Sequence, residues 1–243
     1  MPINPRFSRL IAVTIAPILL SQARRVRRVL PDLPEAELPW RGAVPGTDPV
    51  SILVIGDSTA AGVGTERQDD ALPGNLARRL SAEWERGVRW RAIGQSGATS
   101  ADIVGRFLAD ASDEVYDLVF VSIGANDALK LRSSGTYRRN LRTILRRLRA
   151  ISPQALIMVS CLPGFSQFAS LPNPLRWALA LHATNLEAAA RRFVKSEPGV
   201  VMSPPSPVYT PEFFAVDRFH PSASGYREWV DFALTDAKLV RTS

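Results

Sequence analysis

The sequence has few of the side chains from which metal centres and disulfides are built. Its 243 residues include one cysteine, Cys161, and two histidines, His182 and His220. A single cysteine excludes an internal disulfide and a cysteine cluster for zinc or an iron–sulfur centre. Two histidines exclude any mechanism that needs three or four imidazoles. Long apolar runs are also missing: none approaches the roughly 20 residues of a spanning helix, which excludes a polytopic membrane protein.

Positive charge is in excess and is concentrated near the N-terminus. The net charge is +7 and the isoelectric point is about 10.3. Residues 1–42 hold seven arginines against three acidic residues, which accounts for +4 of that charge. The rest of the chain is close to balanced and has no basic patch interleaved with aromatic residues. We therefore expect no nucleic-acid partner.

The first 30 residues combine positive charge with a short apolar stretch. Arg6 and Arg9 precede the stretch from Leu10 to Leu20, and four arginines follow within residues 24–28. The favoured interpretation is that residues 1–30 lie on an anionic membrane surface, with the protein cytoplasmic or peripheral on that membrane. The alternatives are a helix packed on the domain and a signal peptide cleaved after residue 23. Export is opposed by the dense positive charge that follows that position.

Residues 31–49 are rich in proline, which favours a linker or a strap that lies over the domain. We therefore divide the chain into an N-terminal extension, residues 1–49, and a domain, residues 50–239. The extension carries the excess charge, and the loops that carry chemistry all lie in the domain.

Short apolar runs alternate with stretches of helical spacing throughout the domain. The runs predict strands at residues 51–55, 89–93, 118–123, 155–160 and 199–202. The helical stretches are residues 72–84, a segment from residue 100, a segment that ends at residue 151, and residues 174–194 and 222–234. This alternation predicts an α/β fold with a central parallel sheet of about five strands and helices on both faces. In such a sheet the ligand site lies outside the carboxyl ends of the strands.

Three of the predicted strands end in polar loops that contain glycine. The loops are Gly56-Asp57-Ser58, Gly94-Gln95-Ser96-Gly97 and Gly124-Ala125-Asn126-Asp127. A serine at such a turn can expose its hydroxyl as a nucleophile, and the alternative for Ser58 is that it caps the next helix. The amide of Asn126 and the backbone N–H of Gly97 can donate to an oxyanion, although each alone is a common turn residue.

An aspartate and a histidine lie three residues apart in Asp217-Arg218-Phe219-His220-Pro221. On one short loop the carboxylate can orient the imidazole and stabilise its charged form, as a general base requires. The alternative for His220 is a buried structural histidine. The other histidine, His182, falls in an apolar helical stretch, where we expect a surface or lid position.

Together these blocks resemble the SGNH hydrolase superfamily, the GDSL-type esterases and lipases. Its serine, glycine, asparagine and Asp-x-x-His-Pro blocks are similar to residues 54–59, 94–100, 123–127 and 217–221, in the family's order. Thr59 stands where the family name has leucine, a departure that puts nothing catalytic in doubt. Within the family, the sequence looks most like bacterial lysophospholipase-type or short-chain esterases.

The resemblance implies a three-layer α/β/α, flavodoxin-like fold and a serine esterase or lipase without a metal or other cofactor. By this resemblance, the catalytic triad is Ser58, His220 and Asp217, and the oxyanion hole is formed by Ser58, Gly97 and Asn126. The expected partner is a small-molecule acyl ester, with lysophospholipids among the candidates. A carbohydrate O-acetylesterase and a non-catalytic binding module are the alternatives on this fold.

Two other enzyme classes fit the sequence less well. The elbow of an α/β-hydrolase is Gly-x-Ser-x-Gly, and Ala60 replaces its second glycine here. A metallophosphoesterase with two metals would need several histidines. The apolar segment 164–181 is either a flap over an acyl pocket or plain helix packing.

Overall fold

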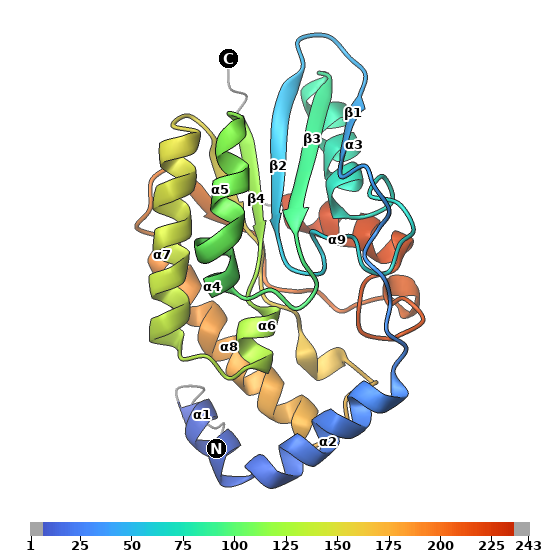
Figure 1. Cartoon of the computed structure of the whole chain (residues 1–243), viewed down its shortest axis with the longest axis vertical. Helices are drawn as coiled ribbons and strands as arrows, with labels where there is room; N and C mark the ends of the chain where they lie inside the picture. The colour runs from blue at the N-terminus through green and yellow to red at the C-terminus, as the bar shows by residue number, and fades with distance from the viewer. Residues whose placement is uncertain (1–6, 236–243) are drawn as a thin grey trace.

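The computed structural model of the chain describes residues 7–235 and has a six-stranded sheet at its centre (Figure 1). The strands are β1 (Arg41–Val44), β2 (Val50–Gly56), β3 (Val88–Gly94), β4 (Leu118–Ser122), β5 (Leu156–Val159) and β6 (Val200–Met202). Their order is β1-β3-β2-β4-β5-β6, in which β1 is antiparallel to β3 and every other pair is parallel. The five predicted strands are confirmed, each end to within one residue.

Helices cover both faces of this sheet, which confirms the predicted three-layer α/β/α fold (Figure 1). One face carries α3 (Leu72–Trp84) and α9 (Ala223–Leu234). The other carries α4 (Ser100–Asp102), the π-turn η2 (Ile103–Phe107), α5 (Leu108–Asp110), α7 (Ser134–Ile151) and α8 (Leu175–Val194). Shorter elements complete the chain: α6 (Ala125–Leu129) and the 3₁₀ turns η3 (Ala111–Asp113), η4 (Phe165–Gln167) and η5 (Pro211–Phe213).

Alternate residues of β2 bury their side chains on opposite faces of the sheet. Leu53 and Ile55 pack in the core with α7 and α8, whereas Ile52 and Val54 pack in the core with α3 and α9. A strand buried on both faces has to be apolar at nearly every position, and β2 is accordingly a continuous apolar run. Because β2 lies between β3 and β4, its carboxyl end is at the middle of the sheet edge. Ser58 follows directly after that end.

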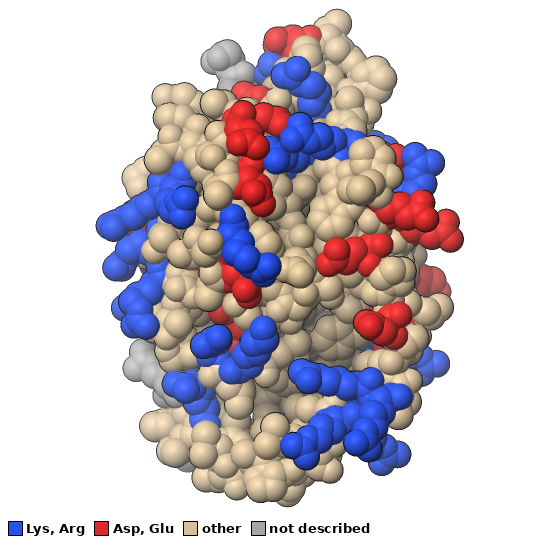
Figure 2. Space-filling view, in the orientation of Figure 1, with Lys and Arg blue, Asp and Glu red and all other residues tan. Residues whose placement is uncertain are grey.

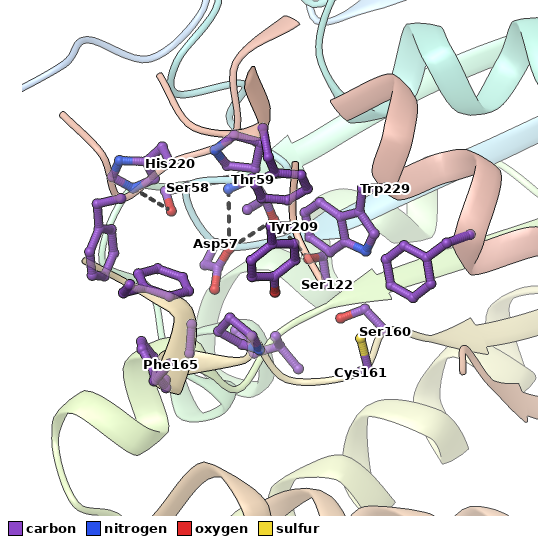
Figure 3. Close-up of a pocket in the computed structure, with 18 residues that line it drawn as sticks. Asp57, Ser58, Thr59, Ser122, Ser160, Cys161, Phe165, Tyr209, His220 and Trp229 are labelled. Atoms are coloured by element: carbon purple, nitrogen blue, oxygen red, sulfur yellow. Dashed lines mark hydrogen bonds between the residues drawn. The ribbon is translucent and has the colours of Figure 1, made fainter. Parts of the chain in front are cut away.

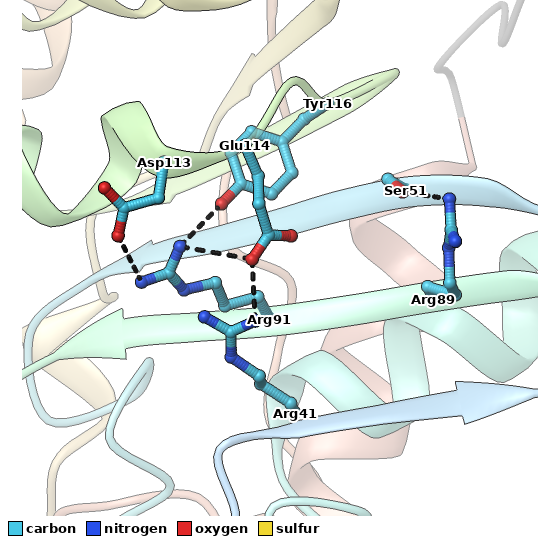
Figure 4. Close-up of polar contacts among 7 residues, drawn as sticks. All are labelled: Arg41, Ser51, Arg89, Arg91, Asp113, Glu114 and Tyr116. Atoms are coloured by element: carbon cyan, nitrogen blue, oxygen red, sulfur yellow. Dashed lines mark hydrogen bonds and ion pairs between the residues drawn. The ribbon is translucent and has the colours of Figure 1, made fainter.

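The edge strand β1 lies in the segment for which the sequence predicts only a linker or strap. Its register places Arg41 opposite Arg91 of β3, and two like charges would repel there. Glu114 lies between them and accepts hydrogen bonds from Nη1 of Arg41 at 2.7 Å and Nη1 of Arg91 at 3.4 Å (Figure 4). The strand has only four residues, and the carboxylate that neutralises its arginine lies 73 residues away in the sequence. The local sequence therefore gives no pattern from which β1 could be predicted. The boundary between the N-terminal extension and the domain, at residues 49 and 50, remains a prediction. The predicted end of the domain, residue 239, lies outside the described residues.

Two helices precede β1 and pack against α8 (Figure 1): α1 (Ser8–Thr14) and α2 (Ala16–Val29). His182 of α8 is fully buried at this contact, so the expected surface or lid position is wrong. Its Nε2 donates to the carbonyl of Arg132 at 3.0 Å, so its Nδ1 accepts from the hydroxyl of Ser8 at 2.9 Å. Burial lowers the pKa of His182, which favours this neutral form. Within residues 7–235, no helix has the length and apolar character needed to cross a membrane.

Candidate active site

Ser58 lies in a tight turn directly after β2. Gly56 passes so close to the carbonyl of Ser122 in β4 that a Cβ at residue 56 would collide with it. The carboxylate of Asp57 then accepts hydrogen bonds from the N–H of Thr59 at 3.1 Å and from its hydroxyl at 3.0 Å. A third hydrogen bond, 2.7 Å long, joins the hydroxyls of Thr59 and Ser122. The turn is therefore held against the end of β4, and Ser58 has little freedom to move.

Three side chains form a continuous hydrogen-bonded chain at this turn. Nε2 of His220 lies 3.1 Å from Oγ of Ser58 (Figure 3), and its Nδ1 lies 2.6 Å from Oδ2 of Asp217. Because an ionised carboxylate only accepts, Nδ1 carries the proton and Nε2 is free to accept from the serine hydroxyl. Ser58 does not cap a helix, since the next helix begins only at Leu72. The structure thus brings together the three residues predicted for a triad.

The carboxylate of Asp217 is held by more than the imidazole. Its Oδ1 accepts hydrogen bonds from the backbone N–H groups of Phe219 and His220, each at 3.0 Å. Burial by itself raises the pKa of Asp217, but the hydrogen bonds from His220 and Phe219 outweigh it, so that the pKa lies below its usual value. Asp217 is therefore ionised at neutral pH and stabilises a positive charge on His220.

The loop that carries His220 packs directly on the turn that carries Ser58. The backbone of Gly64 has a φ of +100° and lies against the carbonyl of Pro221, where a Cβ would collide. Tyr226, in α9, donates its hydroxyl to the carbonyl of Val63 at 2.7 Å. Residues 163 positions apart are thereby held together, and the separation of Ser58 and His220 is fixed.

The two other residues predicted for the site lie at the same sheet edge. Gly97 lies in the loop after β3, and Asn126 lies in the first turn of α6, after β4. The buried carboxylate of Asp127 joins these loops by accepting the N–H of Ser100 at 2.8 Å and its hydroxyl at 2.7 Å. Nζ of Lys130 also donates to the carbonyl of Gly97 at 3.3 Å. Among the described residues, neither Gly97 nor Asn126 forms a hydrogen bond to Ser58, His220 or Asp217.

Glu35 contributes to the site, although no sequence pattern singles it out. Its Oε1 accepts a hydrogen bond from the N–H of Ser96 at 2.7 Å, next to Gly97. The following residue, Ala36, is buried and donates its N–H to the carbonyl of Ala61 at 2.9 Å. The strap before β1 therefore supports both the Gly97 loop and the Ser58 turn. Proline content indicates a strap, but no local signal identifies which of its side chains reaches the site.

An apolar cavity begins at Ser58 and His220 and extends toward α9 (Figure 3). Its aromatic lining comes from η4 and η5 and the residues next to them, from the loop that carries His220, and from α9: Phe165, Phe168, Tyr209, Phe213, Phe219, Trp229 and Phe232. The cavity measures about 70 Å³. Two residues of the segment 164–181, Phe165 and Phe168, line this cavity. Of the two interpretations of that segment, a flap over an acyl pocket requires such a position and plain helix packing does not.

Cys161 lines the same cavity without belonging to the hydrogen-bonded chain. Burial raises the pKa of its thiol to about 12, so it is protonated at neutral pH and a poor nucleophile. Within residues 7–235, the structure has no group of three or more His, Cys, Asp or Glu side chains that could hold a metal ion. The hydroxyl of Ser58, 3.1 Å from Nε2 of His220, is placed to act as a nucleophile.

Residues 54–228 match the family model of the GDSL-like lipase/acylhydrolase family. The chain belongs to this family. A curated relative, "GDSL-like esterase Rv1075c" of Mycobacterium tuberculosis, is 32% identical over 212 residues. That match covers 82% of this chain and 65% of the relative, so the chain spans about two-thirds of the relative's length. The description of the GDSL-like family names lipases and acylhydrolases, enzymes that cleave carboxylic esters.

Solved structures share the fold of this GDSL-like protein at low sequence identity. An extracellular lipase from Streptomyces rimosus has a TM-score of 0.57 at 20% identity, over 76% of this chain and 99% of that chain. The acetylxylan esterase Axe2 from Geobacillus stearothermophilus has a TM-score of 0.55 at 19% identity, over 78% of this chain and 94% of that chain. At such identities the comparison establishes the fold and leaves the substrate open.

Asp57 of this GDSL-like protein should make stability depend on pH. Burial raises its pKa from 3.8 to about 6, although the hydrogen bonds from Thr59 oppose the shift. The folded state therefore binds the proton more tightly than the unfolded state. It follows that Asp57 lowers the free energy of unfolding progressively as the pH rises from 3.8 to about 6.

We expect Asp57→Asn to be more stable relative to wild type at pH 7 than at pH 4, by on the order of 2–3 kcal/mol. Denaturant unfolding of both proteins at the two pH values measures this difference. Asp110→Asn, which alters an exposed carboxylate, is the matched control. A difference between Asp57→Asn and wild type that is the same at both pH values would contradict the assignment.

Proposed function

We propose that this GDSL-like protein hydrolyses carboxylic esters through an acyl-enzyme formed on Ser58. The observation that supports this most strongly is the Asp217–His220–Ser58 chain, with bonds of 2.6 and 3.1 Å. Family membership supports the same reaction class. A binding module would have no need for an ionised carboxylate that orients an imidazole toward a serine hydroxyl.

In the first half-reaction, Oγ of Ser58 attacks the ester carbonyl while Nε2 of His220 takes the hydroxyl proton. Asp217 holds the imidazole in the required tautomer and stabilises the imidazolium. The tetrahedral intermediate collapses, and the alcohol leaves with the proton from His220. In the second half-reaction His220 takes a proton from water, the hydroxide attacks the acyl group, and the acid is released as Ser58 regains its proton.

The oxyanion of each tetrahedral intermediate needs donors that are already in place. We assign this role to the backbone N–H groups of Ser58 and Gly97 and to the side-chain amide of Asn126. The Asp127–Ser100 and Glu35–Ser96 hydrogen bonds fix the loops that carry Gly97 and Asn126. Preorganised donors cost no reorganisation during the reaction, which is why such supporting bonds matter for the rate.

The cavity beside Ser58 supports an acyl ester with a chain of short to medium length. Its lining is largely aromatic and its volume is about 70 Å³, which suits a short apolar acyl chain better than a long one. A lysophospholipid would require Trp229 or Phe232 at the far end to move. A carbohydrate O-acetylesterase would leave most of the cavity empty, so we place it second.

The variants Ser58→Ala and His220→Ala test the proposed reaction. Each should lower kcat for a short soluble ester by about 10³-fold or more, and the double variant should lose little beyond that, since the residues act as a unit. Initial rates and thermal unfolding are measured together, with Ser166→Ala, an exposed serine, as the matched control. Additive losses in the double variant, or an active Ser58→Ala, would overturn the assignment.

The length of the cavity is tested with p-nitrophenyl esters of increasing acyl length. We expect kcat/KM to peak near butyrate to hexanoate and to fall for longer chains. Trp229→Ala enlarges the far end and should move the peak to longer chains, whereas Trp177→Ala, a tryptophan outside the cavity, should not. A peak at acetate that Trp229→Ala leaves unchanged would favour the O-acetylesterase, and a peak at long chains in wild type would favour a lysophospholipase.

A further inference from the structure

One face of the helix pair α1 and α2 packs against the rest of the domain. Ala12 and Leu19 are buried, and Ile15, Ala23 and Val26 pack partly buried against the core cluster that includes α8. Polar contacts fix the pair in place as well. Besides the bond from Ser8 to His182, the side chain of Gln22 donates to the carbonyl of Asn173 at 2.7 Å and accepts from the N–H of Leu175 at 3.0 Å. The orientation of the pair on the domain is therefore defined, and so is its outer face.

The exposed side chains of this pair include many that are apolar, mostly in its first half. Six side chains of residues 7–29 are large, apolar and each more than half exposed: Phe7, Leu10, Val13, Ile18 and Leu20 up to the start of α2, and Val29 at its end. They are half of the twelve exposed large apolar side chains on the described residues, although they come from a tenth of those residues. Isolated exposed apolar residues need no explanation, but their concentration in one segment points to a surface that contacts a partner.

The second half of α2 presents arginine instead. Arg24, Arg25, Arg27 and Arg28 are all exposed, and Figure 2 shows basic side chains gathered at the lower end of the molecule, where α2 lies. Residues 7–29 contain no aspartate or glutamate. Within the part of the chain that the structure describes, none of these four arginines forms an ion pair. Their charge is thus available to an anionic partner.

We propose that the outer face of α1 and α2 docks on an anionic lipid bilayer. The apolar side chains of α1 and the start of α2 insert between headgroups, and the four arginines of α2 contact lipid phosphates. Two signals, apolar insertion and basic charge, are what stable attachment to such a surface requires. The proposal concerns where the protein acts and does not depend on the reaction at Ser58.

Docking in this way places the bilayer at the end of the molecule that holds the candidate active site. Gln22 of α2 contacts residues 173 and 175, which follow the pocket-lining segment with Phe165 and Phe168. The chain then leaves α2 and reaches the Gly97 loop through Glu35. An ester at the membrane surface is therefore close to the cavity.

A second basic face lies on α7, but it offers only one of the two signals. Arg138, Arg139, Arg142 and Arg146 are exposed there, while the apolar residues of α7 are buried against the sheet. This face carries the same charge as the second half of α2 without apolar side chains to insert. It provides a matched control for the contribution of charge alone.

Co-sedimentation with vesicles tests the proposal on the full-length chain. The vesicles are phosphatidylcholine with or without phosphatidylglycerol, and wild type should bind only those with phosphatidylglycerol, less so as salt is added. Each arginine near an anionic surface strengthens binding about five-fold. Replacing Arg24, Arg25, Arg27 and Arg28 with glutamine should therefore weaken binding by about 100-fold or more.

Three further variants separate the contributions. Leu10→Gln with Val13→Gln should weaken binding about 10-fold without unfolding, because both side chains are exposed. Replacing Arg138, Arg139, Arg142 and Arg146 with glutamine should change binding by only a few fold. Ser58→Ala should bind as wild type does, so a failure of the proposed reaction leaves this test intact.

Two results would overturn the proposal. Equal losses from the α2 and α7 arginine variants would indicate adsorption through net charge alone. No vesicle binding by wild type, together with a dimer in sedimentation velocity that Leu10→Gln with Val13→Gln dissociates, would assign the face to a second copy of the chain. Thermal unfolding confirms that every variant is folded, and hydrolysis of a soluble short ester confirms it for every variant except Ser58→Ala.

Discussion

The contact between the turn after β2 and the loop before α9 is the constraint on which the site depends. Ser58 and His220 come from opposite ends of the domain sequence, and their hydrogen bond requires the two segments to touch. Gly64 against the carbonyl of Pro221, and Tyr226 on the carbonyl of Val63, make that contact close enough. This contact fixes the separation between Ser58 and His220. The hydrogen bonds of Asp217 and the cavity have their places relative to these two residues.

The same turn carries an energetic cost that the rest of the fold offsets. Asp57 is almost fully buried next to Ser58, and its raised pKa shows that the ionised form is disfavoured there. Its carboxylate nevertheless closes the turn by binding Thr59, which in turn binds Ser122. Two other carboxylates, those of Asp127 and Glu35, fix the neighbouring loops. The loops that form the site are thus fixed relative to one another by hydrogen bonds to buried or half-buried carboxylates.

Much of this arrangement could be predicted from sequence, because it depends on local patterns. The buried strands are continuous apolar runs, and Ser58, Gly97 and Asn126 each follow a strand end, so the sheet edge brings them together. Asp217 and His220 share one loop. What could not be predicted depends on contacts between distant segments. Glu114 binds Arg41 of β1 from 73 residues away, Glu35 reaches Ser96 across 61 residues, and His182 is buried where α8 contacts α1.

Labelling with a fluorophosphonate, which reacts preferentially with activated serine hydroxyls, tests most directly whether His220 activates Ser58. Mass spectrometry of the digested protein locates the adduct. We expect one adduct per chain on Ser58, none in Ser58→Ala, and strongly slowed labelling in His220→Ala. Labelling of a different residue, or an unchanged rate in His220→Ala, would contradict the claim that His220 activates Ser58.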